Sequence, residues 1–168
     1  MHRVRSGSIQ LVLIASLVTG AGAVFAGEGA GKSSSQVGGA QVEWLEYGVA
    51  IDRAKQENKH VVIDFYTNWC SWCKRMERTT YADSAVVDFL RKNFLVTKIN
   101  AESKTRIKVG DTDTSGEELA REFAVDRFPI TWFVKPDGSR LDNLPGYVPA
   151  DKFLKVLTFV QTRAYDKK

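Results

Sequence analysis

Two cysteines, Cys70 and Cys73, are the only thiols in the chain, and two residues separate them in the stretch DFYTNWCSWCK. Thiols at this spacing can hold a haem, bind a metal, cross-link the fold or exchange electrons. Haem attachment requires a histidine directly after the second cysteine, where this chain has Lys74. A bridge across so short a loop removes little entropy from the unfolded chain and adds little stability. The pair is therefore expected to serve through its reactivity.

Metal binding by this pair has less support from the rest of the sequence. A structural zinc site needs four ligands, whereas beyond residue 26 the chain adds only His60 to the two cysteines as a Cys or His ligand. His60 starts an expected strand and is interpreted as an ordinary surface or strand-edge histidine. We therefore expect no metal site and no cofactor. Holding or transferring a soft ion such as Cu(I), which thiolates favour, is the alternative function.

A helix is predicted to begin at Cys70 or Ser71 and to run through Met76. At the first turn of a helix, the dipole and the unpaired N–H groups stabilise a thiolate and lower the pKa of the thiol. Cys70 is therefore expected to be the exposed nucleophile that attacks a substrate disulfide. Cys73, one turn further along, is expected to be the buried thiol that resolves the mixed disulfide.

Asp64 lies within the apolar stretch VVIDFY, where a charge is costly. A buried carboxyl group has a raised pKa, which suits acid–base chemistry near neutral pH. Asp64 could then accept the proton of Cys73. In the alternative interpretation, Asp64 points to solvent from an edge strand. The run Val61-Val62-Ile63 indicates a strand buried on both faces and favours the acid–base role.

The segments around these residues predict an α/β domain with a mixed central sheet and helices on both faces. Helices are expected over 47–54, 84–92, 117–125 and from Pro149 onward, and strands over 60–67, 94–100 and 130–135 with an edge strand after the turn KPDG. The crossovers imply parallel pairing early in the chain, and the tight turn implies an antiparallel hairpin late. The polar segment 101–116 predicts a long loop, of the kind that is often functional.

Pro129 directly precedes a strand in RFPITWF. The residues alone favour an ordinary trans proline in a loop. A cis Phe128–Pro129 bond would instead be a deliberate structural feature. It would present the backbone of Phe128 as an edge to an extended substrate segment.

The first 26 residues have the layout of a secretory signal peptide, with Arg3 and Arg5 before an apolar run that ends in the cleavage pattern Val24-Phe25-Ala26. The alternative is an uncleaved N-terminal anchor. Residues 27–41 are rich in Gly and Ser and predict a flexible leader, so the domain is expected over 42–168. The net charge is +4 without a basic run, which gives no support to a nucleic-acid partner.

Together, VVIDFYTNWCSWCK, FPITWF and KPDG resemble the thioredoxin superfamily, over roughly residues 42–165. The flanking sequence is more similar to secreted thioredoxin-like reductases and to the C-terminal domain of the membrane electron transporter DsbD. The resemblance implies a thioredoxin-like fold in which Cys70 attacks, Cys73 resolves and Asp64 transfers the proton. It also implies a cis proline at Pro129, against the trans proline that the residues alone favour.

The resemblance further implies that the substrate-binding residues lie around the cysteine pair. Trp69 matches the tryptophan packed beside the motif, and Gly146 matches the glycine near the substrate groove. The chain departs from cytosolic thioredoxins at Ser71 and Trp72, which replace a Gly-Pro dipeptide that influences the redox potential. Phe128 is bulky for the position before the proline, which should narrow the groove or favour apolar partners.

These observations predict a periplasmic or secreted enzyme that reduces disulfides of exported proteins. The expected partners are protein disulfides and a membrane electron donor, and a monomer is the expected state. A thioredoxin-fold interaction domain without redox activity is a third possibility, which the intact cysteine pair disfavours.

Overall fold

The structure is a computed structural model that describes residues 41–166 of the 168-residue chain. The expected signal peptide and nearly all of the expected leader lie outside these residues. The described elements are α1 (Tyr47–Glu57), β1 (His60–Tyr66), α2 (Ser71–Thr79), α3 (Ser84–Asn93), β2 (Phe94–Asn100), β3 (Arg106–Val109), β4 (Thr112–Ser115), α4 (Gly116–Glu122), β5 (Ile130–Val134), β6 (Arg140–Pro145), α5 (Ala150–Gln161) and the 3-10 helix η1 (Ala164–Asp166). Within this part of the chain, no helix is both long and apolar enough to cross a membrane.

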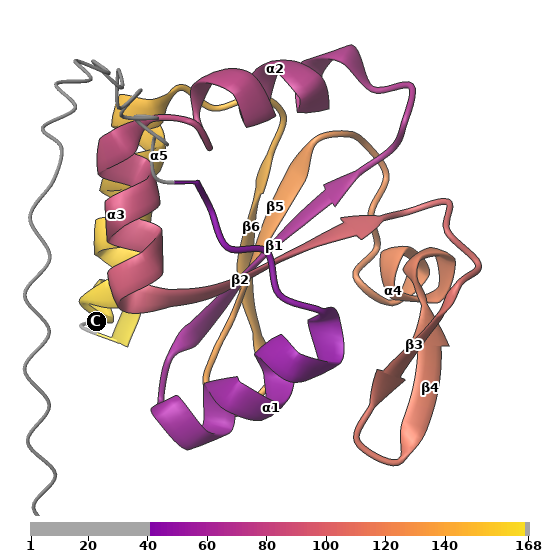
Figure 1. Cartoon of the computed structure of the whole chain (residues 1–168). Coiled ribbons are helices and arrows are strands. Elements are labelled where there is room, and N and C mark those ends of the chain that lie inside the picture. The colour runs from indigo at the N-terminus through magenta and orange to yellow at the C-terminus, as the bar shows by residue number, and fades with distance from the viewer. Residues whose placement is uncertain (1–40, 167–168) are drawn as a thin grey trace, which may run out of the picture. The chain divides into compact units, whose positions relative to one another are not determined.

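A four-stranded mixed sheet in the order β2-β1-β5-β6 forms the centre of the domain (Figure 1). β1 pairs with β2 in parallel and with β5 in antiparallel orientation, and β5 pairs with β6 in antiparallel orientation. The predicted parallel pairing early in the chain and the hairpin late in the chain are therefore confirmed. β1 has a neighbour on each side, which places Asp64 in a central strand and excludes the alternative of an edge strand.

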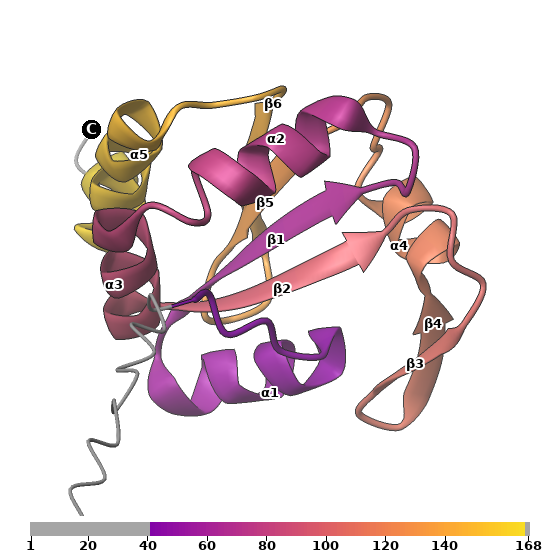
Figure 2. The same cartoon turned by 45° about the horizontal axis from the view of Figure 1, so that its top comes forward.

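Each face of the sheet carries its own hydrophobic core. One core contains Val62 of β1 together with buried residues of α3 and α5, and Met76 of α2 joins it. The other contains Val61, Ile63 and Phe65 of β1 together with α1 and α4. Figure 2 shows α3 beside α5, and α2 above the C-terminal half of β1. Because side chains alternate along a strand, Asp64 points to the same face as Val62, toward α2.

The segment 101–116 is not the long loop that its polarity predicts. It folds into a second, two-stranded antiparallel sheet of β3 and β4, which turn at Gly110 with a φ of +57°. Ile107 and Val109, on one side of β3, pack against the core that contains Tyr47 of α1. Only two apolar residues therefore anchor this hairpin, which explains why its sequence looks like a loop.

Gly48 allows α1 to approach the hairpin closely. A Cβ atom at this position would lie 2.0 Å from the backbone oxygen of Lys108. In an unobstructed helix, Gly→Ala normally stabilises a protein by about 0.5–1 kcal/mol. Here the added carbon would collide with backbone, so the sign of the effect should be reversed.

We expect Gly48→Ala to lower the free energy of unfolding by about 1–3 kcal/mol, because α1 and the hairpin must move apart. Urea denaturation followed by circular dichroism measures the change. Val49→Ala is the matched control, because the Val49 side chain is 47% exposed on the same helix, and its effect should stay within about 0.5 kcal/mol. A gain of stability in Gly48→Ala would contradict the close contact.

Candidate active site

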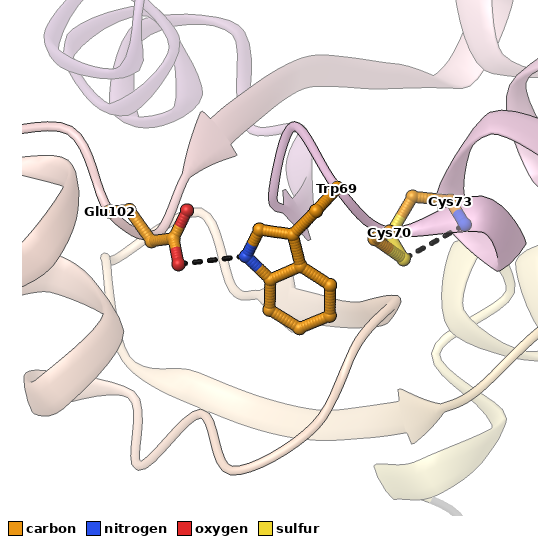
Figure 3. The surroundings of a disulfide bond; sticks show 4 residues. All are labelled: Trp69, Cys70, Cys73 and Glu102. Atoms are coloured by element: carbon orange, nitrogen blue, oxygen red, sulfur yellow. Dashed lines mark hydrogen bonds between the residues drawn. A yellow bond between two sulfur atoms is a disulfide. The ribbon is translucent and has the colours of Figure 1, made fainter.

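The two cysteines form a disulfide at the N-terminus of α2, with an S–S distance of 2.09 Å. Cys70 is the N-cap residue, and its Sγ accepts a hydrogen bond from the backbone N–H of Cys73 at 3.0 Å (Figure 3). The predicted helix start is therefore correct. The expected difference in exposure is not seen in this disulfide-bonded state, in which Cys70 is 4% and Cys73 8% exposed. The N-cap position, rather than exposure, distinguishes Cys70.

Asp64 lies beneath α2 in the middle of the sheet. Its neighbours across the strands are Lys98 of β2 and Thr131 of β5. Asp64 is only 7% exposed, and its Oδ1 has no hydrogen-bond partner among the described residues. Asp64 and Cys73 line the same cavity of about 170 Å³, which is large enough for water. The structure therefore connects the carboxyl group with the second cysteine through this cavity.

Burial raises the pKa of Asp64 from 3.8 to about 7. The charge of Lys98 and the hydroxyl group of Tyr81 lower this pKa, and the negative charge of Glu77 raises it by a smaller amount. Desolvation dominates because the carboxyl group lies inside the sheet layer, where an ionised form is poorly solvated. At neutral pH, Asp64 can therefore both accept and release a proton.

Lys98 and Glu77 form an ion pair of 2.8 Å, and both line the cavity that contains Asp64. The ammonium group of Lys98 also lies 5.3 Å from the ring centroid of Trp44 and 4.8 Å from that of Tyr66. Cation–π contacts of this kind hold an ammonium group at the wall of a site. The Lys98 charge is thus fixed near Asp64 without a direct ion pair between them.

Lys98 and Glu77 were not predicted from the sequence as residues of this site. Two signals could have found them. Glu77 follows Cys73 by four residues, which places both on one face of a helix. Lys98 interrupts the apolar strand FLVTKIN, as Asp64 interrupts VVIDFY, and two charged residues within neighbouring buried strands can face each other.

Trp69 connects the cysteine loop with two other segments. Its indole Nε1–H donates a hydrogen bond of 2.9 Å to Glu102 (Figure 3). Its ring packs edge-on against Phe128, with centroids 5.9 Å apart. Trp69 nevertheless stays 66% exposed. The structure therefore brings together the predicted residues Trp69 and Phe128 and adds Glu102, which the sequence analysis missed.

The Phe128–Pro129 peptide bond is cis. The trans loop proline favoured by the residues alone is therefore wrong, and the isomer implied by the family resemblance is the one observed. The carbonyl oxygen of Pro129 accepts a hydrogen bond of 2.8 Å from the N–H of Gly146, whose φ is +80°. Pro129 and Gly146 thus lie side by side.

The two residues between the cysteines lie at the surface. Ser71 is the first residue of α2 and is exposed. Trp72 is 51% exposed, and its ring lies 5.7 Å from that of Tyr147, next to Gly146. Three contacts therefore join the segments 69–72, 128–129 and 146–147 around the disulfide.

His60 is not the surface or strand-edge histidine that the sequence suggests. It is 4% exposed at the start of β1, and its Nε2 lies 2.6 Å from the hydroxyl group of Tyr165. Desolvation lowers the pKa of His60. Its role is to hold the C-terminal 3-10 helix against the sheet. Between residues 41 and 166, no group of three or more His, Cys, Asp or Glu side chains is arranged to hold a metal ion.

Comparison with known proteins agrees with this fold. The model of the thioredoxin-like domain family matches residues 47–161. The thiol:disulfide interchange protein DsbD of Pseudomonas fluorescens is 32% identical over 116 residues, which cover 68% of this chain and 18% of that protein. The disulfide bond reductase DsbH of Chlamydia pneumoniae is 23% identical over 114 residues, which cover 67% of this chain and 68% of that protein.

Solved structures show the same relationship. A thioredoxin-fold protein from Helicobacter pylori has a TM-score of 0.60 at 29% identity, and the match covers 66% of this chain and 73% of that one. The oxidised C-terminal domain of Neisseria meningitidis DsbD has a TM-score of 0.50 at 31% identity, covering 64% of this chain and 87% of that one.

The chain therefore belongs to the thioredoxin-like domain family. Its cysteine pair at a helix N-terminus defines a thiol–disulfide oxidoreductase domain of the DsbD and DsbH type. The chain spans less than a fifth of the length of the DsbD protein from Pseudomonas fluorescens.

We expect Asp64→Asn to stabilise the protein increasingly as the pH rises. The pKa of Asp64 is higher in the folded state than in the unfolded state, so its contribution to stability is greatest below pH 4. That contribution is lost as the pH rises through about 7. Because an amide does not ionise, the variant should gain up to about 4 kcal/mol over the wild type between pH 4 and pH 8.

Urea denaturation of both proteins, with the disulfide intact, at several pH values measures this difference. Asp88→Asn is the matched control, because Asp88 is exposed on α3. A stability difference between Asp64→Asn and the wild type that does not change with pH would show that Asp64 ionises normally.

Proposed function

We propose that this protein is a periplasmic thiol–disulfide reductase that acts on exported proteins. The observation that carries the proposal is the shared cavity of Asp64 and Cys73 behind a disulfide whose other cysteine caps a helix. This arrangement gives the two cysteines different chemistry. It supports Cys70 as the nucleophile and Cys73 as the thiol that Asp64 deprotonates later.

The first step is the attack of Cys70 on a substrate disulfide. In the reduced protein, the Cys70 thiolate is stabilised by the N-terminus of α2 and by the backbone N–H of Cys73, which points at Sγ in the oxidised state. The Sγ of Cys70 bonds to one substrate sulfur, the substrate S–S bond breaks, and the other substrate sulfur leaves as a thiolate.

The second step releases the substrate. Asp64, ionised near its pKa of about 7, takes the proton of the Cys73 thiol through the cavity. The Cys73 thiolate attacks the Sγ of Cys70, and the second substrate sulfur leaves as a thiolate. The protein ends with the Cys70–Cys73 disulfide, and two electrons have passed from its dithiol to the substrate.

Three observations support the reducing direction and the location. The dipeptide Ser71-Trp72 lacks the histidine of strongly oxidising relatives, and similar proteins carry the names thiol:disulfide interchange protein and disulfide bond reductase. The pattern of residues 1–26 supports export to the periplasm. Renewed turnover requires a dithiol donor, for which we propose a membrane electron-transfer protein. The substrate segment would bind to residues around the disulfide, namely Pro129, Gly146, Phe128, Trp69 and Trp72.

We expect Cys73→Ser to accumulate a covalent mixed disulfide with substrate proteins, because the resolving thiol is missing. Non-reducing electrophoresis of periplasmic extracts, with and without dithiothreitol, detects these adducts. Cys70→Ser is the matched control and should form none, since it lacks the nucleophile. Adducts in the control variant, or none in Cys73→Ser, would contradict the assigned roles.

The reduction potential of the Cys70–Cys73 pair should lie near that of thioredoxin, about −270 mV, and far below the value of about −120 mV of the oxidant DsbA. Equilibration with glutathione or dithiothreitol buffers, followed by the fluorescence of the tryptophans beside the pair, measures it. Cys70→Ser provides the baseline without a redox transition. A potential near −120 mV would reverse the proposed direction.

A further inference from the structure

Arg75 lies over two aromatic rings at the edge of the active site. Its guanidinium carbon is 5.1 Å from the ring centroid of Trp72 and 4.9 Å from that of Tyr147. Trp72 directly precedes Cys73, and Tyr147 directly follows Gly146. The cation is therefore held where α2 meets the segment beside Pro129.

The ring of Tyr147 is held in place from both sides. Its hydroxyl group lies 3.2 Å from Oγ1 of Thr79, one turn along α2 from Arg75, and the N–H of the preceding Gly146 is bonded to Pro129. Arg75, Trp72 and Tyr147 thus form a cluster whose geometry is fixed before any partner arrives. We call these three residues the arginine cluster.

The charge of Arg75 has no acidic partner within the described chain. None of the ion pairs among residues 41–166 involves Arg75, although it is exposed and lies two positions from Glu77. Glu77 pairs with Lys98 instead. Contacts with ring faces use the charge of a guanidinium group but none of its N–H donors. The donors of Arg75 therefore remain available for an acceptor.

We propose that the arginine cluster binds a carboxylate of the substrate polypeptide, an Asp or Glu side chain a few residues from the attacked cysteine. This inference rests on the proposed function and adds a specificity to it. A guanidinium fork matches a carboxylate with two parallel hydrogen bonds. The rings of Trp72 and Tyr147 hold the fork in position, so little side-chain entropy is lost on binding.

The spacing along the chain fits this substrate. Arg75 lies five positions after Cys70, which corresponds to a rise of about 7.5 Å along the helix axis at 1.5 Å per residue. An extended polypeptide covers that length in two to three residues, at about 3.3 Å each. A carboxylate two or three residues from the substrate cysteine can therefore reach Arg75 while that cysteine is at Cys70.

The test uses two peptides, each with one intramolecular disulfide. They differ only at the positions two and three residues before and after each cysteine. One peptide has Glu at these positions, and the other has Gln. Reduced protein is mixed with each peptide, and the second-order rate of its oxidation is followed by tryptophan fluorescence. We expect the wild type to react about fivefold faster with the Glu peptide, as one exposed, well-oriented ion pair would give.

In Arg75→Gln the ratio of the rate with the Glu peptide to the rate with the Gln peptide should fall to about one. In Arg75→Lys this ratio should be intermediate, because lysine keeps the charge but lacks the guanidinium fork. Arg78→Gln is the matched control, since Arg78 is an exposed cation on the same helix without contact to the two rings. It should keep the fivefold ratio. A purely structural role of Arg75 would change both rates together and leave the ratio unaltered.

The outcomes separate this inference from the proposed function. Equal rates with both peptides in the wild type would overturn the carboxylate site and leave the reductase intact. Loss of the ratio in Arg78→Gln as well would also overturn it, because the general field of α2 would then explain the preference. Failure of both peptides to oxidise the wild type would overturn the reductase, and the carboxylate site with it.

Discussion

The burial of one carboxyl group, Asp64, is the constraint on which this site depends. A carboxylate inside a sheet layer loses most of its hydration, and the protein compensates only in part, with the charge of Lys98 and the hydroxyl group of Tyr81. This incomplete compensation brings the pKa to about 7. A direct ion pair with Lys98 would favour the ionised form and lower the pKa, and Asp64 would then be less suited to the proposed role of a base near neutral pH. The pairing of Lys98 with Glu77 prevents this.

The sheet order explains how such a position can exist. β1 is central, so Asp64 has a strand on each side, and it shares a cavity with residues of α2. The same alternation that places Val62 in a hydrophobic core directs Asp64 toward the N-terminal half of α2, where Cys73 lies. Cys70 must in turn be the N-cap of α2, because an N-cap sulfur receives the backbone N–H of Cys73. Strand register and helix start together set the chemistry.

Much of this arrangement was predictable from the sequence, because it rests on local patterns. The apolar run before Asp64 indicated a strand buried on both faces, and the position of the cysteines indicated a helix start. The pairing of Lys98 with Glu77 was not predicted, because it joins β2 to α2 across a tertiary contact. The β3–β4 hairpin was missed because Ile107 and Val109 are its only apolar anchors, too few for a strand signal. The cis bond at Pro129 depends on its surroundings, and only the family resemblance indicated it.

The aromatic residues at the rim of the site are held in place but left exposed, unlike the buried residues of its interior. Trp69 and Trp72 remain 66% and 51% exposed, although burying such rings would stabilise the fold. Each is instead fixed by contacts with neighbouring side chains, Trp69 by Glu102 and Phe128, Trp72 by Tyr147 and Arg75. A ring that is held in place and left exposed loses little entropy when a partner covers it, so its burial contributes to binding rather than to folding. In the proposed function, the interior of this protein therefore sets the reactivity of the cysteines, and the exposed aromatic rim determines which disulfides reach them.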